Sequence, residues 1–423
     1  MSPGAAGQTG RPCGPRWVVN LPPDGDPADP IRYLRQSLGR VPPDRRRHLR
    51  SFAATADGGL TAVASGAGAA SAPLLDLASN DYLGFSHHPR LQQAACDAIA
   101  RDGTGSGSSP LVTGTRPVHT LLAQTLANWL GRGQVLLFPS GFQANLAAVL
   151  ALTGRHGVVL ADRLIHHSLL LGVQASGSRL VRFRHNDSAD LERRLIQQRT
   201  AAPQSQLLVI TESLFSMEGT SPDLVAIARL CRQQGARLLV DEAHGLGVLG
   251  PGGRGLAHGL AGVSLVSGTF GKAFGSGGAF LAADAPLADW LLQSSGAFRY
   301  STALAPSLAA AALAALELLQ EDPGLGQTLL SRAERWRCGL AAAGWQRPEG
   351  AGPVLPLLVG DDGAALALQA QLERAGLLSV AIRPPTVPEG SARLRLVLRR
   401  SLPTGTLARL LAALGTPVAG GGR

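Results

Sequence analysis

The sequence has few aromatic residues, few charged residues and few cysteines. Aromatic side chains make up 4% of the 423 residues, which argues against a surface that stacks on nucleic-acid bases. Hydrophobic residues make up 45% and charged residues 16%, so we expect a globular chain with a large core. The cysteines form no CxxC pair and have no metal-ligand spacing, which predicts a protein of the reducing cytosol without a disulfide framework. They are Cys13, Cys96, Cys231 and Cys338.

A segment able to cross a membrane is also missing. The longest uncharged stretch, Gly133 to Gly154, is long enough for a span. Its centre reads PSGFQAN, however, and would place polar and helix-breaking residues at the bilayer midplane. Met1 to about Pro30 is rich in glycine and proline, has no apolar signal core, and is predicted to be disordered. We therefore expect a cytoplasmic protein with no membrane partner.

Positive charge exceeds negative charge along the chain. There are 39 Lys and Arg residues against 29 Asp and Glu residues, a net charge of +10, which on numbers alone permits a nucleic-acid partner. The only dense basic run is Arg45 to Arg50, and no recognition motif surrounds it. We expect no nucleic-acid partner, and a basic nucleic-acid-binding protein without catalysis remains the alternative of another class.

Strand-like and helix-like runs alternate from Gln134 onward, which predicts an α/β fold with a mainly parallel sheet covered on both faces. After about Pro306 the pattern changes to that of a smaller α+β domain. We expect an N-terminal segment over residues 1–73, a large domain over 74–305 and a small domain over 306–423. The predicted strands are Val135–Phe138, Val158–Ala161, Leu180–Phe183, Leu207–Thr211, Leu238–Asp241, Val263–Ser267 and Ala279–Ala282, and the later elements are Ser307–Glu321, Arg332–Ala343, Val354–Val359, Leu394–Leu398 and Thr406–Leu414.

One crossover helix has clear end signals. Ser221 is the expected cap, Pro222 suits the first helical position, and Gly235 ends the helix. Asp223 lies where the helix dipole favours negative charge. The residues expected on its buried side are Leu224, Ile227, Ala228 and Cys231.

Lys272 is the only charged residue in the glycine-rich stretch Ser267 to Gly277. The predicted strand Val263–Ser267 leads into it, so the lysine lies just past a strand end. Poor solvation among glycine, alanine and phenylalanine lowers the pKa of an amine. Lysines of this kind form Schiff bases with carbonyl groups, including that of pyridoxal 5′-phosphate (PLP). The alternative is an ordinary loop lysine that extends into water.

Asp241 ends another apolar run and precedes Lys272 by 31 residues, about one strand–crossover–strand unit. Ligands bind at the carboxyl ends of strands in open α/β sheets. A carboxylate there can keep a pyridine nitrogen protonated, so that the ring accepts electrons. Either acid of the pair Asp241–Glu242 alone would also fit a simple turn cap, but together with Lys272 the pattern favours a PLP site.

Two further segments fit the same cofactor. In Phe138–Asn145 a strand runs into Ser-Gly and then a helix, whose free amides and dipole favour a phosphate group. Thr269 can add a hydroxyl. His166 follows the strand Val158–Ala161, where its flat ring can stack on a cofactor, although a histidine in such a place is more often structural.

Taken together, seven segments resemble the α-oxoamine synthases, PLP enzymes of the aspartate-aminotransferase fold (fold type I), from about Leu74 to Leu414. The chain departs from the family pattern at Pro110, where an arginine is common, and at Glu242, where an aspartate is common. The segments are SNDYLGFSHHP (79–89), FPSGFQAN (138–145), HNDSADL (185–191), ESLFSMEG (212–219), VDEAHGLGVLG (240–250), TFGKAFG (269–275) and AIRPPTVPEGSARLRL (381–396).

The resemblance implies a role for each candidate residue. Lys272 binds PLP as a Schiff base and later moves protons, Asp241 pairs with the pyridine nitrogen, and His166 stacks on the ring. For Arg395 the alternative is an exposed strand arginine, and for the pair Ser301–Thr302 it is a cap of the helix near Pro306. The remaining roles are Ser216 and His244 near the phenolic oxygen; Gly141, Phe142 and Thr269 at the phosphate; Ser301 and Thr302 at the neighbouring subunit's phosphate, in an obligate homodimer; and Arg395, Asn80 and Arg45 at the substrate.

The resemblance also implies a reaction, the decarboxylative condensation of L-alanine with a pimeloyl thioester in biotin biosynthesis. The thioester carrier is coenzyme A (CoA) or an acyl carrier protein, and the arginine-rich composition suits either an acidic carrier protein or an anionic acyl group. Family members that use glycine, making 2-amino-3-ketobutyrate or 5-aminolevulinate, are the alternative. The segment 381–396 is more similar to the alanine-using enzyme.

Overall fold

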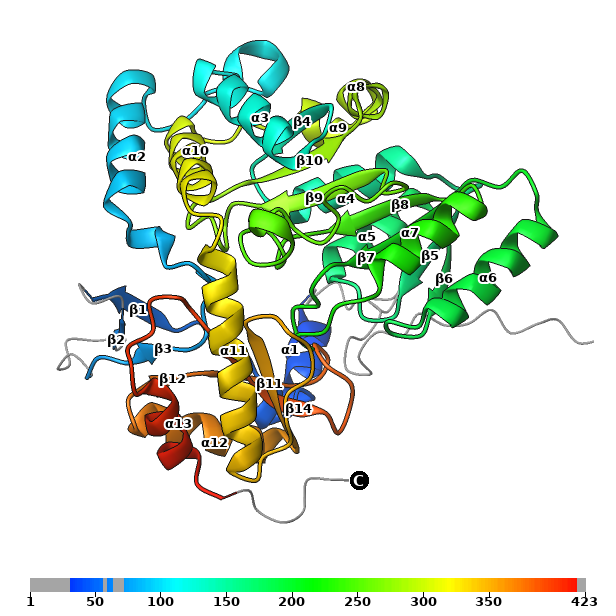
Figure 1. The fold of residues 1–423 in the computed structure, drawn as a ribbon. Helices are drawn as coiled ribbons and strands as arrows, with labels where there is room; N and C mark the ends of the chain where they lie inside the picture. Colours follow the sequence, from blue (N-terminus) through cyan, green and yellow to red (C-terminus); the bar gives the residue numbers. More distant parts are fainter. Residues whose placement is uncertain (1–30, 56–58, 64–71, 417–423) are drawn as a thin grey trace, which may run out of the picture.

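A computed structural model of the chain describes residues 31–55, 59–63 and 72–416 (Figure 1). Its largest element is a seven-stranded sheet in the order β4-β10-β9-β8-β7-β5-β6. Strand β10 is antiparallel to both of its neighbours, and all other neighbouring pairs are parallel. The predicted mainly parallel α/β fold is therefore confirmed. The strands are β4 Gln134–Phe138, β5 Val158–Asp162, β6 Arg179–Phe183, β7 Leu207–Glu212, β8 Arg237–Asp241, β9 Leu265–Thr269 and β10 Ala279–Ala283.

All seven strands lie within two residues of their predicted bounds, because most are short Leu/Val/Ile/Ala/Phe runs between polar or glycine-containing breaks. Alternate side chains of one strand enter two different cores. Leu238 and Val240 pack in one cluster while Leu239 packs in the other. Both faces of the sheet are therefore buried, as a sheet covered by helices on two sides requires.

The helices of this part cover both faces of the sheet (Figure 1). The crossover helix α7 starts later than predicted, because the Asp223 carboxylate caps it by accepting a hydrogen bond from the Ala226 amide at 2.9 Å. The prediction of Ser221 as the cap was wrong, whereas the predicted buried side is confirmed. The helices are α2 Pro89–Asp102, α3 Pro117–Leu130, α4 Gly141–Leu152, α5 His167–Ser176, α6 Ser188–Ala201, α7 Leu224–Gln233, α8 Ala285–Ser294, α9 Gly296–Arg299 and α10 Pro306–Glu321, with short turns η2 Phe85–His87, η3 Pro110–Gly114 and η4 Pro251–Gly253.

The C-terminal part holds a three-stranded antiparallel sheet in the order β11-β14-β13. The short strand β12 pairs in parallel with β3, which joins this part to the chain entering the large sheet. One hydrophobic core runs from the large sheet to Val354 and Leu394 of the small sheet. The division into domains at residue 305 stays a prediction. The elements are β3 Leu75–Asp76, α11 Leu325–Ala342, β11 Val354–Gly360, α12 Asp362–Arg374, β12 Leu377–Leu378, β13 Val380–Ile382, β14 Ala392–Val397 and α13 Thr406–Leu414.

The N-terminal described residues form helix α1 (Arg32–Gly39), the turn η1 (Pro43–Arg45) and a hairpin of β1 (Ser51–Ala54) and β2 (Leu60–Val63). Leu60 pairs with both β1 and Leu74, so this part of the N-terminal segment is a strand. The predicted disorder of Met1 to Pro30 lies outside the described residues.

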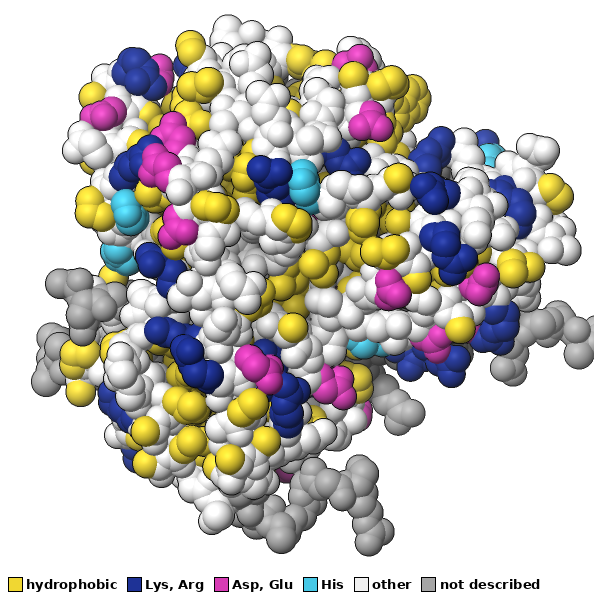
Figure 2. Space-filling model, viewed as in Figure 1, with side chains coloured by type: hydrophobic (Ala, Val, Ile, Leu, Met, Phe, Trp, Pro, Cys, Tyr) yellow, Lys and Arg dark blue, Asp and Glu magenta, His cyan; other side chains and the backbone are white. Residues whose placement is uncertain are grey.

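Arginine side chains gather on the side of the molecule where Figure 1 places β6 and α6 (Figure 2). Some are neutralised locally, since Arg193 and Arg194 both bind the buried Asp190 carboxylate. In the part of the chain that the structure describes, no helix combines the length and the apolar character that a bilayer crossing needs.

Candidate active site

Three neighbouring strands of the large sheet end in polar side chains. Glu212 ends β7, Asp241 ends β8 and Thr269 ends β9. Glu212 stands opposite Asp241 in the strand register, and Asp241 stands opposite Ser267. The carboxyl edge of the sheet therefore presents two acids and a hydroxyl side by side, at the edge where open α/β sheets bind ligands.

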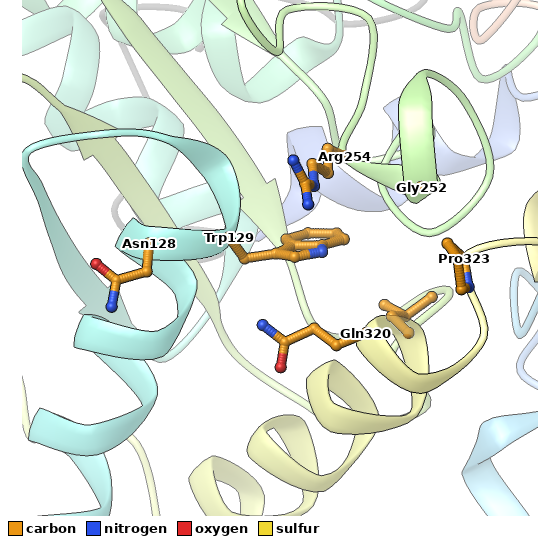
Figure 3. Close-up of a pocket in the computed structure, with 7 residues that line it drawn as sticks. Asn128, Trp129, Gly252, Arg254, Gln320 and Pro323 are labelled. Carbon is orange, nitrogen blue, oxygen red and sulfur yellow. The ribbon is translucent and has the colours of Figure 1, made fainter.

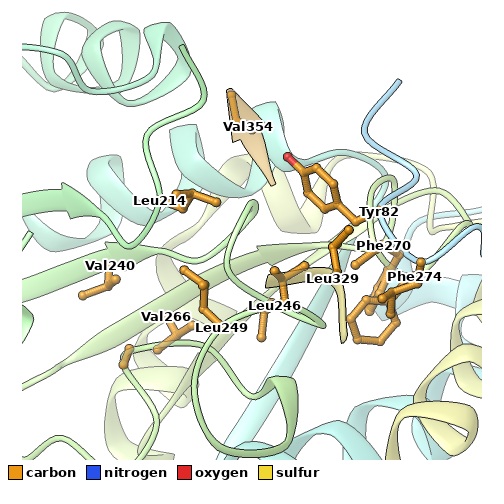
Figure 4. Packing of buried hydrophobic residues seen from close by; sticks show 14 of the residues in the cluster. Tyr82, Leu214, Val240, Leu246, Leu249, Val266, Phe270, Phe274, Leu329 and Val354 are labelled. Atoms are coloured by element: carbon orange, nitrogen blue, oxygen red, sulfur yellow. The ribbon is translucent and has the colours of Figure 1, made fainter. Parts of the chain in front are cut away.

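Lys272 follows β9 in a loop that is anchored to the hydrophobic core by two aromatic side chains. Phe270 and Phe274 are fully buried and point into the same cluster as Tyr82 (Figure 4). Gly275 has a φ of +59°, and a Cβ there would lie 2.4 Å from the Ser86 amide nitrogen, so this position requires glycine. Packing and close backbone approach thus hold the lysine at the sheet edge.

The Lys272 amine is the only one of its kind, since the 423 residues contain one lysine and 38 arginines. Burial lowers its pKa to about 8, with a smaller contribution from Arg395 in the same direction, while Asp241 and Glu212 oppose the shift. Among the described residues, the amine makes no hydrogen bond or ion pair. A partly neutral, unpaired amine beside two acids is available for reaction with a carbonyl group.

Asp241 is held in place by hydrogen-bond donors on both oxygens. The Asn145 side-chain amide donates to Oδ2 at 2.7 Å, and the Ala243 backbone amide donates to Oδ1 at 2.8 Å. Asp241 is 5% exposed. The residue does cap the following turn, as the simpler interpretation proposed, and one carboxylate serves both purposes.

His166 lies at the start of α5, where its backbone amide donates to Glu212 Oε1 at 2.6 Å. Its ring Nδ1 lies 2.7 Å from Ser168 Oγ, which in turn accepts from Asn145 at 3.0 Å. Reduced hydration lowers the pKa of His166, Asp241 opposes this change, and Lys272 adds to it. The His166 ring is therefore tied through two side chains to the residue that holds Asp241.

His244 and Arg395 form a second line of contacts. The Tyr82 hydroxyl lies 2.5 Å from His244 Nδ1, and burial followed by Lys272 and Arg395 lowers the pKa of His244 well below its usual value. Arg395 Nη2 donates to Asn80 Oδ1 at 2.9 Å, and its Nε donates to the Ser216 carbonyl at 2.6 Å. Arg395 is 7% exposed, so the alternative of an exposed strand arginine was wrong.

Helix α4 begins beside the end of β9. Ser140 caps it by accepting from the Gln143 amide at 3.3 Å. A Cβ at Gly141 would lie 3.7 Å from Thr269 Cβ, so the helix start and the threonine are close neighbours. The Thr269 hydroxyl donates to the Gly278 carbonyl at 2.9 Å and accepts from the Gly271 amide at 3.2 Å.

The donors present fit PLP at each end of that molecule. The helix start, including the exposed residue Phe142, suits its phosphate, Asp241 suits a protonated pyridine nitrogen, and Lys272 suits its aldehyde. The side-chain oxygen of Asn145 is buried without a partner in the described residues, which marks a polar position within this group. Lys272, Asp241, His166, Thr269 and the helix start at Gly141 are thus assembled around one sheet edge.

Three predicted residues have other contacts. Ser301 Oγ accepts from the Gln143 side-chain amide of the same chain at 2.5 Å, and Thr302 is exposed. Neither caps α10, whose N-cap is Ala305 with no side-chain hydrogen bond, so that alternative was wrong. Arg45 binds Asp362 at 2.7 Å and Glu389 at 2.6 Å, so its guanidinium is paired with these two carboxylates.

The sequence analysis assigned no role to Asn145, Ser168, Glu212 or Tyr82. Asn145 belongs to the segment FPSGFQAN and lies one helical turn after Gly141, so it faces the sheet. That spacing was a usable signal. Its partner Asp241 is 96 residues away in sequence, so the contact itself was not visible.

A cavity of about 400 Å³ lies apart from this cluster and is shown in Figure 3. It places the Trp129 indole between the side chains of Arg254 and Gln320. Trp129 meets the Phe274 ring edge-on, with centroids 6.2 Å apart. None of the predicted site residues lines it; the lining residues are Asn128, Trp129, Gly252, Arg254, Leu319, Gln320 and Pro323.

Comparison with known proteins assigns the chain to a family. Residues 72–414 match the family model described as aminotransferase class I and II. The chain belongs to this family, so it is a PLP-dependent enzyme, and the predicted cofactor and enzyme class are confirmed.

Within that family the chain belongs with the 8-amino-7-oxononanoate synthases. It is 42% identical over 376 residues to the protein of that name from Gluconacetobacter diazotrophicus, covering 87% of this chain and 93% of the relative. It is 45% identical over 330 residues to the one from Acidithiobacillus ferrooxidans, covering 77% and 83%. The predicted resemblance is confirmed.

Solved structures show the same fold. Serine palmitoyltransferase from Sphingomonas wittichii superposes with a TM-score of 0.83 at 26% identity, covering 92% of this chain and 97% of that one. The 8-amino-7-oxononanoate synthase from Francisella tularensis superposes with a TM-score of 0.68 at 26% identity, covering 81% and 96%.

Proposed function

We propose that the chain condenses L-alanine with a pimeloyl thioester to give 8-amino-7-oxononanoate, carbon dioxide and the free thiol, a step of biotin biosynthesis. The single observation that carries the proposal is the Lys272 amine, which has a lowered pKa and has Asp241, Glu212 and Arg395 as electrostatic neighbours. Sequence identity of 42% to 45% to proteins of that name supports the choice of reaction within the fold.

When bound, PLP supplies an aromatic ring that accepts the electron pair released at the amino-acid α-carbon. Lys272 would hold its aldehyde carbon and Asp241 its pyridine nitrogen. The His166 ring would cover one face, with Ser216 and His244 near the phenolic oxygen. The helix start at Gly141 and Phe142, together with Thr269, would hold the phosphate.

Once the amino group of alanine has displaced it, Lys272 would act as the base that takes the α-proton of alanine. Because its pKa is about 8, about a tenth of the amine is neutral at pH 7, far more than for an ordinary lysine. The same group returns a proton to the product carbon. A single residue next to the sheet edge thus moves protons in both directions.

Arg395 binds the carboxylate of the incoming amino acid. Two of its nitrogens are already fixed by Asn80 and by the Ser216 carbonyl, so the guanidinium is oriented before substrate arrives. A buried cation without an anionic partner is costly, and the substrate carboxylate offsets that cost. Departure of that carboxylate as carbon dioxide removes the attraction and favours product release.

The bond changes balance when one proton is taken up from water. A bond forms between the alanine α-carbon and the acyl carbonyl carbon, the carbon–sulfur bond breaks, and the thiol leaves with a proton. The carbon–carbon bond to the alanine carboxylate then breaks and carbon dioxide leaves. The acyl group is carried by CoA or by an acyl carrier protein. We propose that Arg45 acts on this substrate indirectly, because its own side chain is paired with Asp362 and Glu389.

We also propose that the active unit is a homodimer. Leu111 and Val112 of η3 are 55% and 73% exposed, and an apolar cavity of about 380 Å³ lies beside them along the edge strand β4. A second copy would cover this surface and bring Ser301 and Thr302 towards the phosphate of the neighbouring site. Such a contact is reciprocal under two-fold symmetry.

The proposal is tested by the products formed from pairs of substrates. Purified protein would be incubated with alanine or glycine and with pimeloyl, acetyl or succinyl thioesters, and the amino ketones identified by mass spectrometry. We expect the highest kcat/KM for alanine with a pimeloyl thioester. A higher kcat/KM for glycine with acetyl or succinyl thioesters would assign the chain to the glycine-using alternative.

A further inference from the structure

Glu212 is a buried acid to which the proposed reaction gives no role. It is 3% exposed and ends strand β7 directly opposite Asp241 in the sheet register. Two carboxyl groups thus lie at adjacent strand ends within one buried group of side chains. An acid in this position is costly unless it does not carry its charge or makes specific hydrogen bonds.

The contact that Glu212 makes is to the loop that carries His166. Its Oε1 accepts the His166 backbone amide at 2.6 Å. The loop's other end is tied by Asp162, whose carboxylate accepts the Leu164 amide at 2.9 Å. The position of the His166 ring relative to the sheet edge therefore depends on a hydrogen bond from a neighbouring strand, which holds the loop across the sheet.

The same contact closes a ring of interactions around Asp241. From His166 the contacts run through Ser168 to Asn145, and Asn145 donates to Asp241 at 2.7 Å. Asp241 then stands opposite Glu212 in the register. Releasing the Glu212 contact would free the loop at the point where this ring of contacts begins.

Charge distinguishes the two acids. Asp241 receives two hydrogen-bond donors, from Asn145 and Ala243, whereas Glu212 accepts from the His166 backbone amide. Burial, followed by Asp241, raises the pKa of Glu212 well above its usual value; Lys272 and the His166 amide oppose the shift, and Glu218 adds to it. The neutral form of Glu212 is therefore favoured, and Asp241 is the acid that has a hydrogen-bond donor on each oxygen.

We propose that Glu212 is a positioning residue, whose side-chain oxygen fixes the His166 loop over the cofactor site by accepting the His166 backbone amide. The inference rests on the proposed PLP site, but not on the identity of the amino acid or acyl substrate. It predicts that PLP affinity depends on an acceptor oxygen at residue 212 and does not depend on a negative charge there.

The chain offers a matched control in Glu242. This acid is also fully buried, and it follows Asp241 directly at the end of β8. It accepts the Ala257 amide at 2.6 Å, so it holds a loop that carries no candidate site residue. Loss of either glutamate removes a buried acid, but only loss of Glu212 frees His166.

The test measures PLP affinity of the apoprotein by absorbance titration, with thermal unfolding of each variant as a check on folding. We expect Glu212→Gln to bind PLP within about threefold of wild type, because its amide oxygen still accepts and it is uncharged, like the protonated acid. Glu212→Ala is expected to bind at least about tenfold more weakly, a loss of one backbone hydrogen bond of roughly 1.4 kcal/mol. Glu242→Ala is expected to lower the unfolding temperature while keeping PLP affinity within about threefold.

Three results would overturn the inference. Equal losses in Glu212→Gln and Glu212→Ala would mean that residue 212 acts as an anion. Unchanged affinity in Glu212→Ala would mean that it positions nothing, and an equal loss in Glu242→Ala would mean that any strand-end acid has the same effect. If Glu212→Ala does not fold, Glu212→Asp replaces it, since the shorter side chain keeps the acid but withdraws the acceptor. Failure of wild type to bind PLP would instead count against the PLP site, and failure to form 8-amino-7-oxononanoate would count only against the proposed substrates.

Discussion

The side-chain amide of Asn145 donates a 2.7 Å hydrogen bond to the Asp241 carboxylate, across 96 residues of sequence and between a helix and a strand end. Asn145 is 3% exposed and belongs to α4, the helix whose first turn is the proposed phosphate site. One helix therefore contributes to both ends of the cofactor site. Its first turn would set the phosphate, and its second turn sets the carboxylate that faces the ring.

Asp241→Asn is expected to lower kcat/KM by several orders of magnitude, because an amide does not keep the pyridine nitrogen protonated. A fall of less than about tenfold, roughly 1.4 kcal/mol of barrier, would remove Asp241 from this role. Asn145→Ala is the companion variant. It leaves the carboxylate but removes one charge-assisted donor, so its loss should be clearly smaller, about tenfold.

Lys272→Ala is expected to abolish turnover while the protein still folds and still binds PLP through the phosphate and ring contacts. The substitution removes no hydrogen bond or ion pair within the described residues, so the unfolding temperature should change little. Activity and circular dichroism measured side by side check both statements. Substantial condensation activity in this variant would contradict the proposed attachment residue.

Attachment of PLP to the apoprotein is expected to become faster as pH rises through about 8 and to level off above that midpoint. The reason is that only the neutral amine reacts, and the pKa of Lys272 is lowered to about 8. Stopped-flow absorbance across this range gives the midpoint. Because Asp241 raises this pKa, Asp241→Asn should shift the midpoint to lower pH, and a shift to higher pH would contradict the electrostatic account.

Glu242 makes stability depend on pH in a defined direction. Burial raises its pKa from 4.5 to about 7, while Ser213 and the Ala257 amide oppose the shift. Its contribution to stability is therefore full below about pH 4.5 and is lost as pH rises through about 7. We expect the unfolding temperature of Glu242→Gln relative to wild type to increase from pH 5 to about pH 8, as measured by scanning calorimetry, and an opposite trend would show that the acid is charged in the fold.

The double variant Ser301→Ala with Thr302→Ala is expected to bind PLP more weakly, since its hydroxyls would serve the partner's phosphate. Mixing it with Lys272→Ala protein should restore activity, because some mixed dimers keep one site with Lys272 and an intact neighbouring pair. Sedimentation that shows an active monomer would contradict the shared site. No recovery despite proven subunit exchange would contradict it equally.

Much of the fold was predictable because most strands of the large sheet are short apolar runs and the crossover helix α7 is bounded by helix-start and helix-stop residues. The β1–β2 hairpin was missed, since Ser51–Ala54 and Leu60–Val63 are half-exposed and show no clear alternation. Helix α12 was missed as well, although the Asp361 carboxylate caps it by accepting the Ala364 amide at 2.8 Å. Local signals of this kind are present in the sequence but are weak on their own.

The candidate site was predictable where residue type and strand-end position coincide, as for Lys272 and Asp241. It was not predictable where a side chain acts through a distant partner. Glu212 gave no local sign that it would meet the backbone of His166, 46 residues earlier. For Arg45 the resemblance suggested a substrate contact, but its side chain forms ion pairs with the carboxylates of Asp362 and Glu389.

Lys272 is the one lysine of the chain, and the 38 arginines do not lose their protons at ordinary pH. Reagents that modify amines therefore have a single side chain to find on this protein. Borohydride reduction of a bound aldehyde would fix it to this one side chain without any engineering, and the single lysine-containing peptide would report whether that position is open or occupied. For the same reason, any aldehyde that reacts with a lysine of this protein blocks the proposed cofactor attachment residue, since no other lysine competes for it.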